Sequence, residues 1–136
     1  MKKQRQIEKD GLIVTHFGGL HSYKDAEEAL NELLEINKGK KQIYEIVIND
    51  DDIKLDFNRA EEQRVNEKVK FTFEKFERGA LAVVARHDFV FGLSRMLEIN
   101  IGNEQIAVAV FRSEDLARKW IQEMRSMHNQ ALNSDG

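Results

Sequence analysis

The sequence predicts an α/β fold: a single domain with a mixed, mostly parallel sheet of about five strands and with four helices. Two observations support this prediction. First, short apolar runs typical of strands alternate with segments whose apolar residues recur at helical spacing. Second, the runs at 81–85 and 106–111 are almost continuously apolar, which is typical of parallel strands covered by helices on both faces. The predicted order of elements is β-β-α-β-α-β-α-β-α.

The first segment, residues 4–17, is predicted to be a β-hairpin. Asp10-Gly11 is typical of its turn, because glycine readily takes the positive φ that tight hairpin turns need. A helix is predicted to begin at Ser22, since Ser22 and Asp25 have the spacing of a capping box. Asn37-Lys38-Gly39 marks the end of this helix, because glycine suits the left-handed position that follows a helix.

The middle of the chain is predicted to contain one strand and one long helix. The strand covers residues 43–48, an apolar run interrupted only by Glu45. The helix begins near Asn58, where Asn58 and Glu61 repeat the capping pattern, and it ends before Gly79. Its apolar stripe is Val65, Val69, Phe73 and Phe76.

The second half is predicted to alternate strictly between strands and helices. The strand at 81–85 is followed by a helix at 89–98, then by the strand at 106–111 and by a last helix capped by Ser113. The chain contains no proline, so every predicted strand can donate its backbone N–H groups. Residues 1–128 are assigned to the domain, and the small polar residues 129–136 to a flexible C-terminal tail.

The composition excludes several classes of function. The absence of cysteine excludes disulfides, thiol nucleophiles and Cys-ligated zinc or iron–sulfur sites. With 21 Lys and Arg against 24 Asp and Glu, the net charge of −3 indicates no nucleic-acid partner. No apolar run is long enough to predict a transmembrane segment, and the N-terminus has no apolar core of a signal peptide. We therefore expect a cytoplasmic protein that needs no cofactor.

Three stretches of the second half resemble the SpoIIAA-like branch of the STAS superfamily. They are Ala80-Leu81-Ala82-Val83-Val84, Phe91-Gly92-Leu93-Ser94-Arg95-Met96-Leu97-Glu98, and Ile106-Ala107-Val108-Ala109-Val110-Phe111-Arg112 with Ala117 and Trp120-Ile121. The first half matches this branch mainly in its order of elements. The resemblance implies a compact STAS-like α/β domain.

The resemblance does not extend to the best-known STAS function. Anti-sigma-factor antagonists are switched by phosphorylation of a Ser or Thr where the third strand meets the second helix. The matching residues 49–58 of this chain contain no Ser, Thr or Gly, so a phosphorylation switch at this position is chemically excluded. Other members of the branch are grouped with lipid-binding domains, which points to apolar ligands.

The preferred candidate contacts are Phe71, Phe91 and Arg95. Phe71 lies off the apolar stripe of the second helix, and an aromatic side chain outside the buried face is typical of a pocket mouth or a partner surface. Phe91 and Arg95 lie where the resemblance is strongest, Phe91 as an apolar contact and Arg95 as a polar anchor. The alternative for Arg95 is an ordinary surface ion pair.

The loops at the carboxyl ends of the strands form an alternative site. Ligands of open α/β sheets usually bind there, and the loops contribute His21, Asp50, Asp51, Arg86, His87, Asp88 and Arg112. A site of Asp50, His87, Asp88 and Arg112 would suit a small hydrolase-like or metal-dependent enzyme. No His-x-x-x-His or His-x-Glu spacing supports a metal, and Asp88 is also explained as the cap of the third helix.

We therefore predict a non-enzymatic binding module for a protein partner or an apolar small ligand, with the last helix as a surface for a homodimer. A closed apolar pocket near Phe71 and Phe91 would favour binding. Convergence of His87 and the acidic loop in one cleft would instead favour the enzyme.

Overall fold

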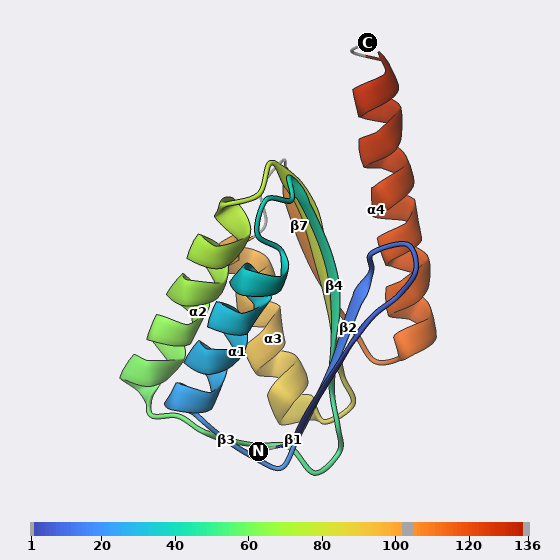
Figure 1. The fold of residues 1–136 in the computed structure, drawn as a ribbon. Helices are drawn as coiled ribbons and strands as arrows, with labels where there is room; N and C mark the ends of the chain where they lie inside the picture. Colours follow the sequence, from blue (N-terminus) through green and yellow to red (C-terminus); the bar gives the residue numbers. More distant parts are fainter. Residues whose placement is uncertain (1, 102–104, 135–136) are drawn as a thin grey trace.

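The computed structural model describes residues 2–101 and 105–134 (Figure 1). The strands are β1 Lys2–Ile7, β2 Ile13–Gly18, β3 Leu20–Ser22, β4 Gln42–Asn49, β5 Lys54–Asp56, β6 Arg78–Ala85 and β7 Ile106–Phe111. The helices are α1 Tyr23–Ile36, α2 Arg59–Glu74, α3 Asp88–Ile101 and α4 Glu114–Ser134.

The main sheet has five strands in the order β1-β2-β4-β6-β7. β1 is antiparallel to β2, and the remaining neighbours pair in parallel. This arrangement confirms the predicted α/β class and the antiparallel edge. A second sheet, formed by the three-residue strands β3 and β5, was absent from the prediction. Strands this short carry too few residues for a recognisable alternation, so only tertiary pairing reveals them.

The helices are distributed unequally over the two faces of the main sheet. Figure 1 shows α1, α2 and α3 on one face and α4 on the other. The core of the three-helix face includes Ile13, Leu33 and Phe73. The core of the α4 face includes Ile46 and Ile121.

Local sequence signals explain the helix starts and the hairpin turn. Capping boxes at Ser22–Asp25 and Asn58–Glu61 are both complete, because each cap and its third helical residue exchange backbone and side-chain hydrogen bonds. Gly11 has a φ of +87°, as the turn between β1 and β2 requires. The predicted starts of α1 and α2 are therefore confirmed.

Helix α4 continues through most of the segment predicted as a tail and reaches Ser134. His128 holds it against the sheet, because Tyr44 Oη lies 2.7 Å from His128 Nδ1 and Arg78 donates to the His128 carbonyl at 2.9 Å. In Figure 1 the end of α4 extends beyond the sheet. Helix α4 thus continues past the domain boundary predicted at residue 128.

No helix in the described ranges combines the length and the apolar character needed to cross a membrane.

Candidate functional site

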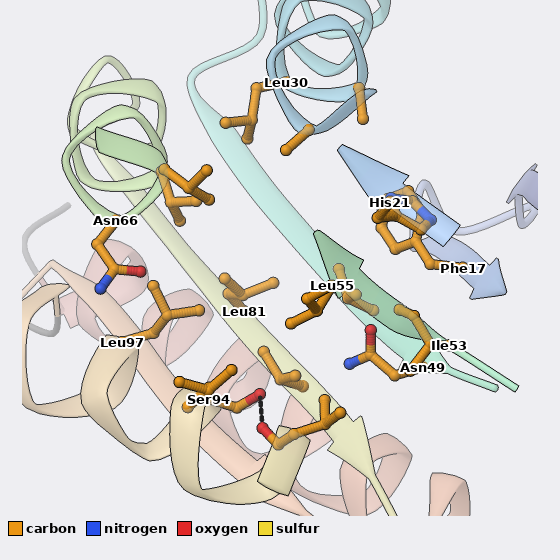
Figure 2. Close-up of a pocket in the computed structure, with 18 of the residues that line it drawn as sticks. Phe17, His21, Leu30, Asn49, Ile53, Leu55, Asn66, Leu81, Ser94 and Leu97 are labelled. Carbon is orange, nitrogen blue, oxygen red and sulfur yellow. Dashed lines mark hydrogen bonds between the residues drawn. The ribbon is translucent and has the colours of Figure 1, made fainter. Parts of the chain in front are cut away.

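A cavity of about 180 Å³ lies between the main sheet and helices α1, α2 and α3 (Figure 2). Its wall is mostly apolar. The sheets contribute Phe17, Val47, Leu55, Leu81 and Val83, and the helices contribute Ala26, Ala29, Leu30, Leu33, Val65, Val69, Phe73, Val90, Leu93 and Leu97. Concave, mostly apolar spaces of this kind are typical of small-molecule sites.

Small side chains of α1 help to leave this space open. Ala26 and Ala29 line the cavity where longer side chains would reach further toward the sheet. Across from them, Val47 lies in the central strand β4 and is only half-buried, although its neighbours Ile46 and Ile48 are buried. The middle of the sheet is therefore accessible from this side.

Two polar side chains of the cavity wall bond to the protein itself. Ser94 Oγ donates to the Val90 carbonyl at 2.8 Å, within α3. Asn49 Nδ2 donates to the Val84 carbonyl at 3.2 Å, between β4 and β6. Asn66 of α2 is half-buried and lies opposite Leu97 of α3 in Figure 2.

Glu45 places a carboxyl group in the cavity wall, where it is 3% exposed. Thr15 Oγ1 donates to Glu45 Oε2 at 3.0 Å, and Arg5 Nη2 lies 4.0 Å from the same oxygen. Burial raises the pKa of this carboxyl from 4.5 to about 7, although Arg5 and Thr15 act in the opposite direction. Near neutral pH Glu45 is therefore present in both protonation states.

His21 is the second buried titratable group of the wall, with 4% of its surface exposed. Its ring meets Phe17 edge-on at a centroid distance of 5.0 Å. Burial lowers the pKa of the imidazole, partly offset by the charge of Asp25, so the ring is neutral at physiological pH. Within the described part of the chain, Nε2 has no hydrogen-bond partner.

The three predicted contacts lie outside this cavity. Phe71 is 63% exposed, with Lys75 Nζ 4.7 Å from its ring centre. Arg95 Nε pairs with Glu98 Oε2 at 3.5 Å on the surface of α3, as the ion-pair alternative expects. Phe91 is half-buried beneath Arg112, whose Cζ lies 3.9 Å from the ring centre.

Two residues close to them in the sequence line the cavity instead: Phe73, two positions after Phe71, and Val90, which directly precedes Phe91. The structure thus contains an apolar pocket, but the pocket is displaced from Phe71 and Phe91. Whether these two side chains contact a partner stays a prediction.

The alternative rim residues form ion pairs on an exposed surface. His87 Nε2 lies 2.8 Å from the Asp51 carbonyl oxygen, whereas Asp50 Oδ1 lies 3.4 Å from His16 Nδ1. The Asp88 carboxylate, the predicted cap of α3, is exposed and pairs with Arg112 Nη2 at 2.9 Å.

His87 therefore contacts the acidic loop outside the cavity, whereas His21 is buried in the cavity wall. In residues 2–101 and 105–134, no three His, Asp or Glu side chains come together as metal ligands would.

Comparison with known proteins identifies the fold. No protein-family model matches the sequence, and a search of curated proteins found no match. The structure is similar to the crystal structure of an uncharacterised protein of the DUF3478 family, with a SpoIIAA-like fold, from Shewanella loihica PV-4. The TM-score is 0.58 at 14% sequence identity, and the match covers 88% of this chain and 92% of that chain.

The chain therefore has a SpoIIAA-like fold, as the resemblance of its second half predicts. A likeness at 14% identity shows the fold alone, so the function has to be argued from the site. Sequence reasoning missed Glu45 as a site residue and placed His21 on the rim. A signal for Glu45 was present, because it is the one charged residue within the apolar run 43–48.

Proposed function

We propose that this protein binds a small apolar molecule in the cavity between the main sheet and helices α1, α2 and α3. The observation that carries the proposal is the cavity itself, which has an apolar wall and a volume of about 180 Å³. An apolar cavity of about 150 Å³ is known to accept benzene. The expected ligand is therefore about the size of one aromatic ring or a short alkyl chain.

The proposal assigns the protein a binding role without a chemical step. His87, the base of the alternative enzyme, lies on the exposed rim, 56% exposed at its side chain, next to Asp51. A general base needs a substrate held within hydrogen-bond reach, and the cavity that could hold one does not include His87 among its lining residues.

Titration with toluene, followed by NMR of the backbone amides, tests the proposal. We expect shifts confined to cavity residues such as Val47 and Leu93. In Val47→Phe the larger side chain occupies the space, so toluene binding should weaken at least about tenfold while the circular dichroism spectrum is kept. The matched control is Phe71→Ala, which removes an aromatic ring outside the cavity and should bind toluene as the wild type does.

The proposal fails if toluene leaves the cavity amides of the wild type unshifted up to its solubility limit. It also fails if Val47→Phe, shown to be folded, binds toluene as tightly as the wild type. Native mass spectrometry of the purified protein would add the mass of any co-purifying ligand and the size of the assembly.

Binding of a protein partner is a second candidate, supported by a different observation. Exposed apolar side chains occur on α2 and α3: Phe71 is 63% exposed, Phe89 71% and Ile99 77%. Sedimentation velocity over a range of concentrations tests the simplest case, a homodimer. If these side chains mediate self-association, Phe89→Ser should remove it, and a wild type that stays monomeric at every concentration would contradict this case.

A further inference from the structure

We infer that the ligand of the cavity is an apolar molecule that carries one amino group, and that the carboxylate of Glu45 binds this group as an ammonium ion. The inference rests on the proposed function and names the chemistry of the ligand. Benzylamine, a single ring with an aminomethyl group, is a simple molecule of this class.

Glu45 lies on the face of the sheet that borders the cavity. Side chains of a strand alternate between its two faces, and in β4 Tyr44 and Ile46 belong to the core under α4. Glu45 therefore points to the three-helix face, as Val47 does. Its register partner in β6 is Leu81, another cavity residue, which is labelled in Figure 2. The carboxyl group is thus part of the cavity wall that the sheet provides.

One oxygen of this carboxyl group is free to bind a ligand. Oε2 accepts the hydrogen bond from Thr15 and lies 4.0 Å from Arg5 Nη2. Oε1 accepts no hydrogen bond from the described residues, yet it is not enclosed, because His21 Nε2 is the one side-chain nitrogen or oxygen of these residues that is both fully buried and unpaired. Since Glu45 is 3% exposed and lines the cavity, the surface that Oε1 keeps opens onto the cavity.

The other polar groups of the wall offer a ligand less. Asn49 and Ser94 donate to backbone carbonyls. Each of the three guanidinium nitrogens of Arg5 donates to a protein oxygen. His21 Nε2 is fully buried, so a ligand does not reach it. Asn66 of α2 is half-buried and can add a hydrogen bond but no charge.

The charges of the wall favour a cation. Glu62 of α2, which is half-buried, adds a second carboxylate to that of Glu45. Arg5 is the one Lys or Arg side chain of the wall. Glu32, which Arg5 also contacts, is paired with Lys3 outside the cavity. Because two carboxylates of the wall face one cation, an ammonium group is attracted to the cavity and a second anion is repelled.

The protonation of Glu45 agrees with a charge that the protein does not fully compensate. The titratable or charged groups of the wall besides Glu45 are Arg5 of β1, His21 of β3 and Glu62 of α2. The pKa of Glu45 is raised to about 7, because burial outweighs the charge of Arg5 and the hydrogen bond from Thr15. An ammonium ion beside Oε1 favours the carboxylate, so binding of an amine should lower this pKa.

The test compares benzylamine with benzyl alcohol, which have the same shape and differ in charge. Dissociation constants are measured by NMR titration at about pH 8, where Glu45 is mostly ionised and an aliphatic amine keeps its proton. Glu45→Gln keeps the size of the side chain but loses its charge. We expect the preference for benzylamine over benzyl alcohol to fall about tenfold in this variant.

Glu35→Gln is the matched control, because Glu35 is exposed on α1 and lies outside the cavity wall. The variant loses the same net charge and should keep the wild-type preference.

A measurement on the wild type covers the case in which Glu45→Gln does not fold. The carbon-13 resonance of the Glu45 carboxyl group follows its titration, and benzylamine should lower the midpoint by about one pH unit or more, whereas benzyl alcohol should not.

The inference is overturned if toluene binds and benzylamine does not, if a folded Glu45→Gln keeps the wild-type preference, or if benzylamine leaves the titration midpoint of Glu45 unmoved. Toluene that leaves the cavity amides of the wild type unshifted would instead contradict the proposed function.

Discussion

The two faces of the main sheet bury different kinds of side chain. Under α4 the core is built from aliphatic residues, small alanines and Tyr44, including Ala80 and Ala82 of β6 and Ala117 of α4. On the three-helix face the buried set also includes polar side chains. These are Thr15, His21, Asn37, Glu45, Thr72 and Ser94, the buried polar residues of the described chain.

The polar residues of the three-helix face differ in what they do. Asn37, Thr72 and Ser94 each bond to a backbone carbonyl four residues earlier in their own helix, which satisfies them locally. Glu45 and His21 have no such local solution. A buried carboxyl and an unpaired imidazole lower stability, and their presence beside a cavity is typical of a site kept for binding.

Among the substitutions considered, we expect the largest loss of stability for a buried residue under α4. Ile121→Ala removes a side chain that is 1% exposed and should lower the free energy of unfolding by about 3–4 kcal/mol, through lost burial and the space left behind. Val47→Ala, beside the existing cavity, should cost only about 1 kcal/mol, because Val47 is already half-buried. Urea denaturation measures both, and equal losses would contradict the difference between the faces.

The second-largest effect is expected in how the stability of the protein depends on pH, and it comes from Glu45. Its pKa is about 7 in the folded protein against 4.5 in an unfolded chain, so the folded state binds more protons between these values. The contribution to stability is fully present below pH 4.5 and is lost as the pH rises through 7, an amount of about 3 kcal/mol.

Glu45→Gln tests this by removing the titration while keeping an acceptor for Thr15. Denaturation at several pH values should show the stability of the wild type falling relative to the variant as the pH rises from 4.5 to beyond 7. If the free energies of unfolding of the two proteins changed in parallel with pH, the raised pKa of Glu45 would be refuted.

The smallest effect is expected for Phe71→Ala. The side chain is 63% exposed and lies outside both cores, so the free energy of unfolding should change by less than about 0.5 kcal/mol. Thermal denaturation monitored by circular dichroism measures this. A loss of more than about 1 kcal/mol would show that the ring packs against the protein more closely than its exposure indicates.

Much of the fold is predictable because its signals are local. The Ser22–Asp25 and Asn58–Glu61 patterns place helix starts, and Gly11 marks the hairpin turn, since each depends only on residues within a few positions. The continuous apolar runs likewise predict parallel strands buried on both faces. Strand β6 confirms this for the run 81–85, whereas in β7, the edge strand formed by the run 106–111, four of the six residues are only partly buried. The β3–β5 sheet escaped prediction because its pairing joins segments more than thirty residues apart.

The site depends on contacts that the sequence does not display. Phe71 is off the apolar stripe and is indeed exposed, so periodicity predicted its exposure correctly. Periodicity could not tell that the neighbouring Phe73 faces a cavity, since a buried stripe looks the same whether the space opposite is filled or open. The sequence places His87 and His21 alike in loops after predicted strands, yet His87 is exposed and His21 lies in β3, buried beside Phe17.

The sequence by itself determined the order of the main-sheet strands and the four helices, the caps of α1 and α2, and the absence of a phosphorylation switch at residues 49–58. These are properties of residue type and short spacing, which tertiary contacts cannot alter. Only the tertiary structure decided that three helices share one face of the sheet, that a space remains beneath them, and that Glu45 and His21 border it. The physical reason is that packing and burial depend on which distant side chains meet, and these contacts also set the pKa values of the two groups.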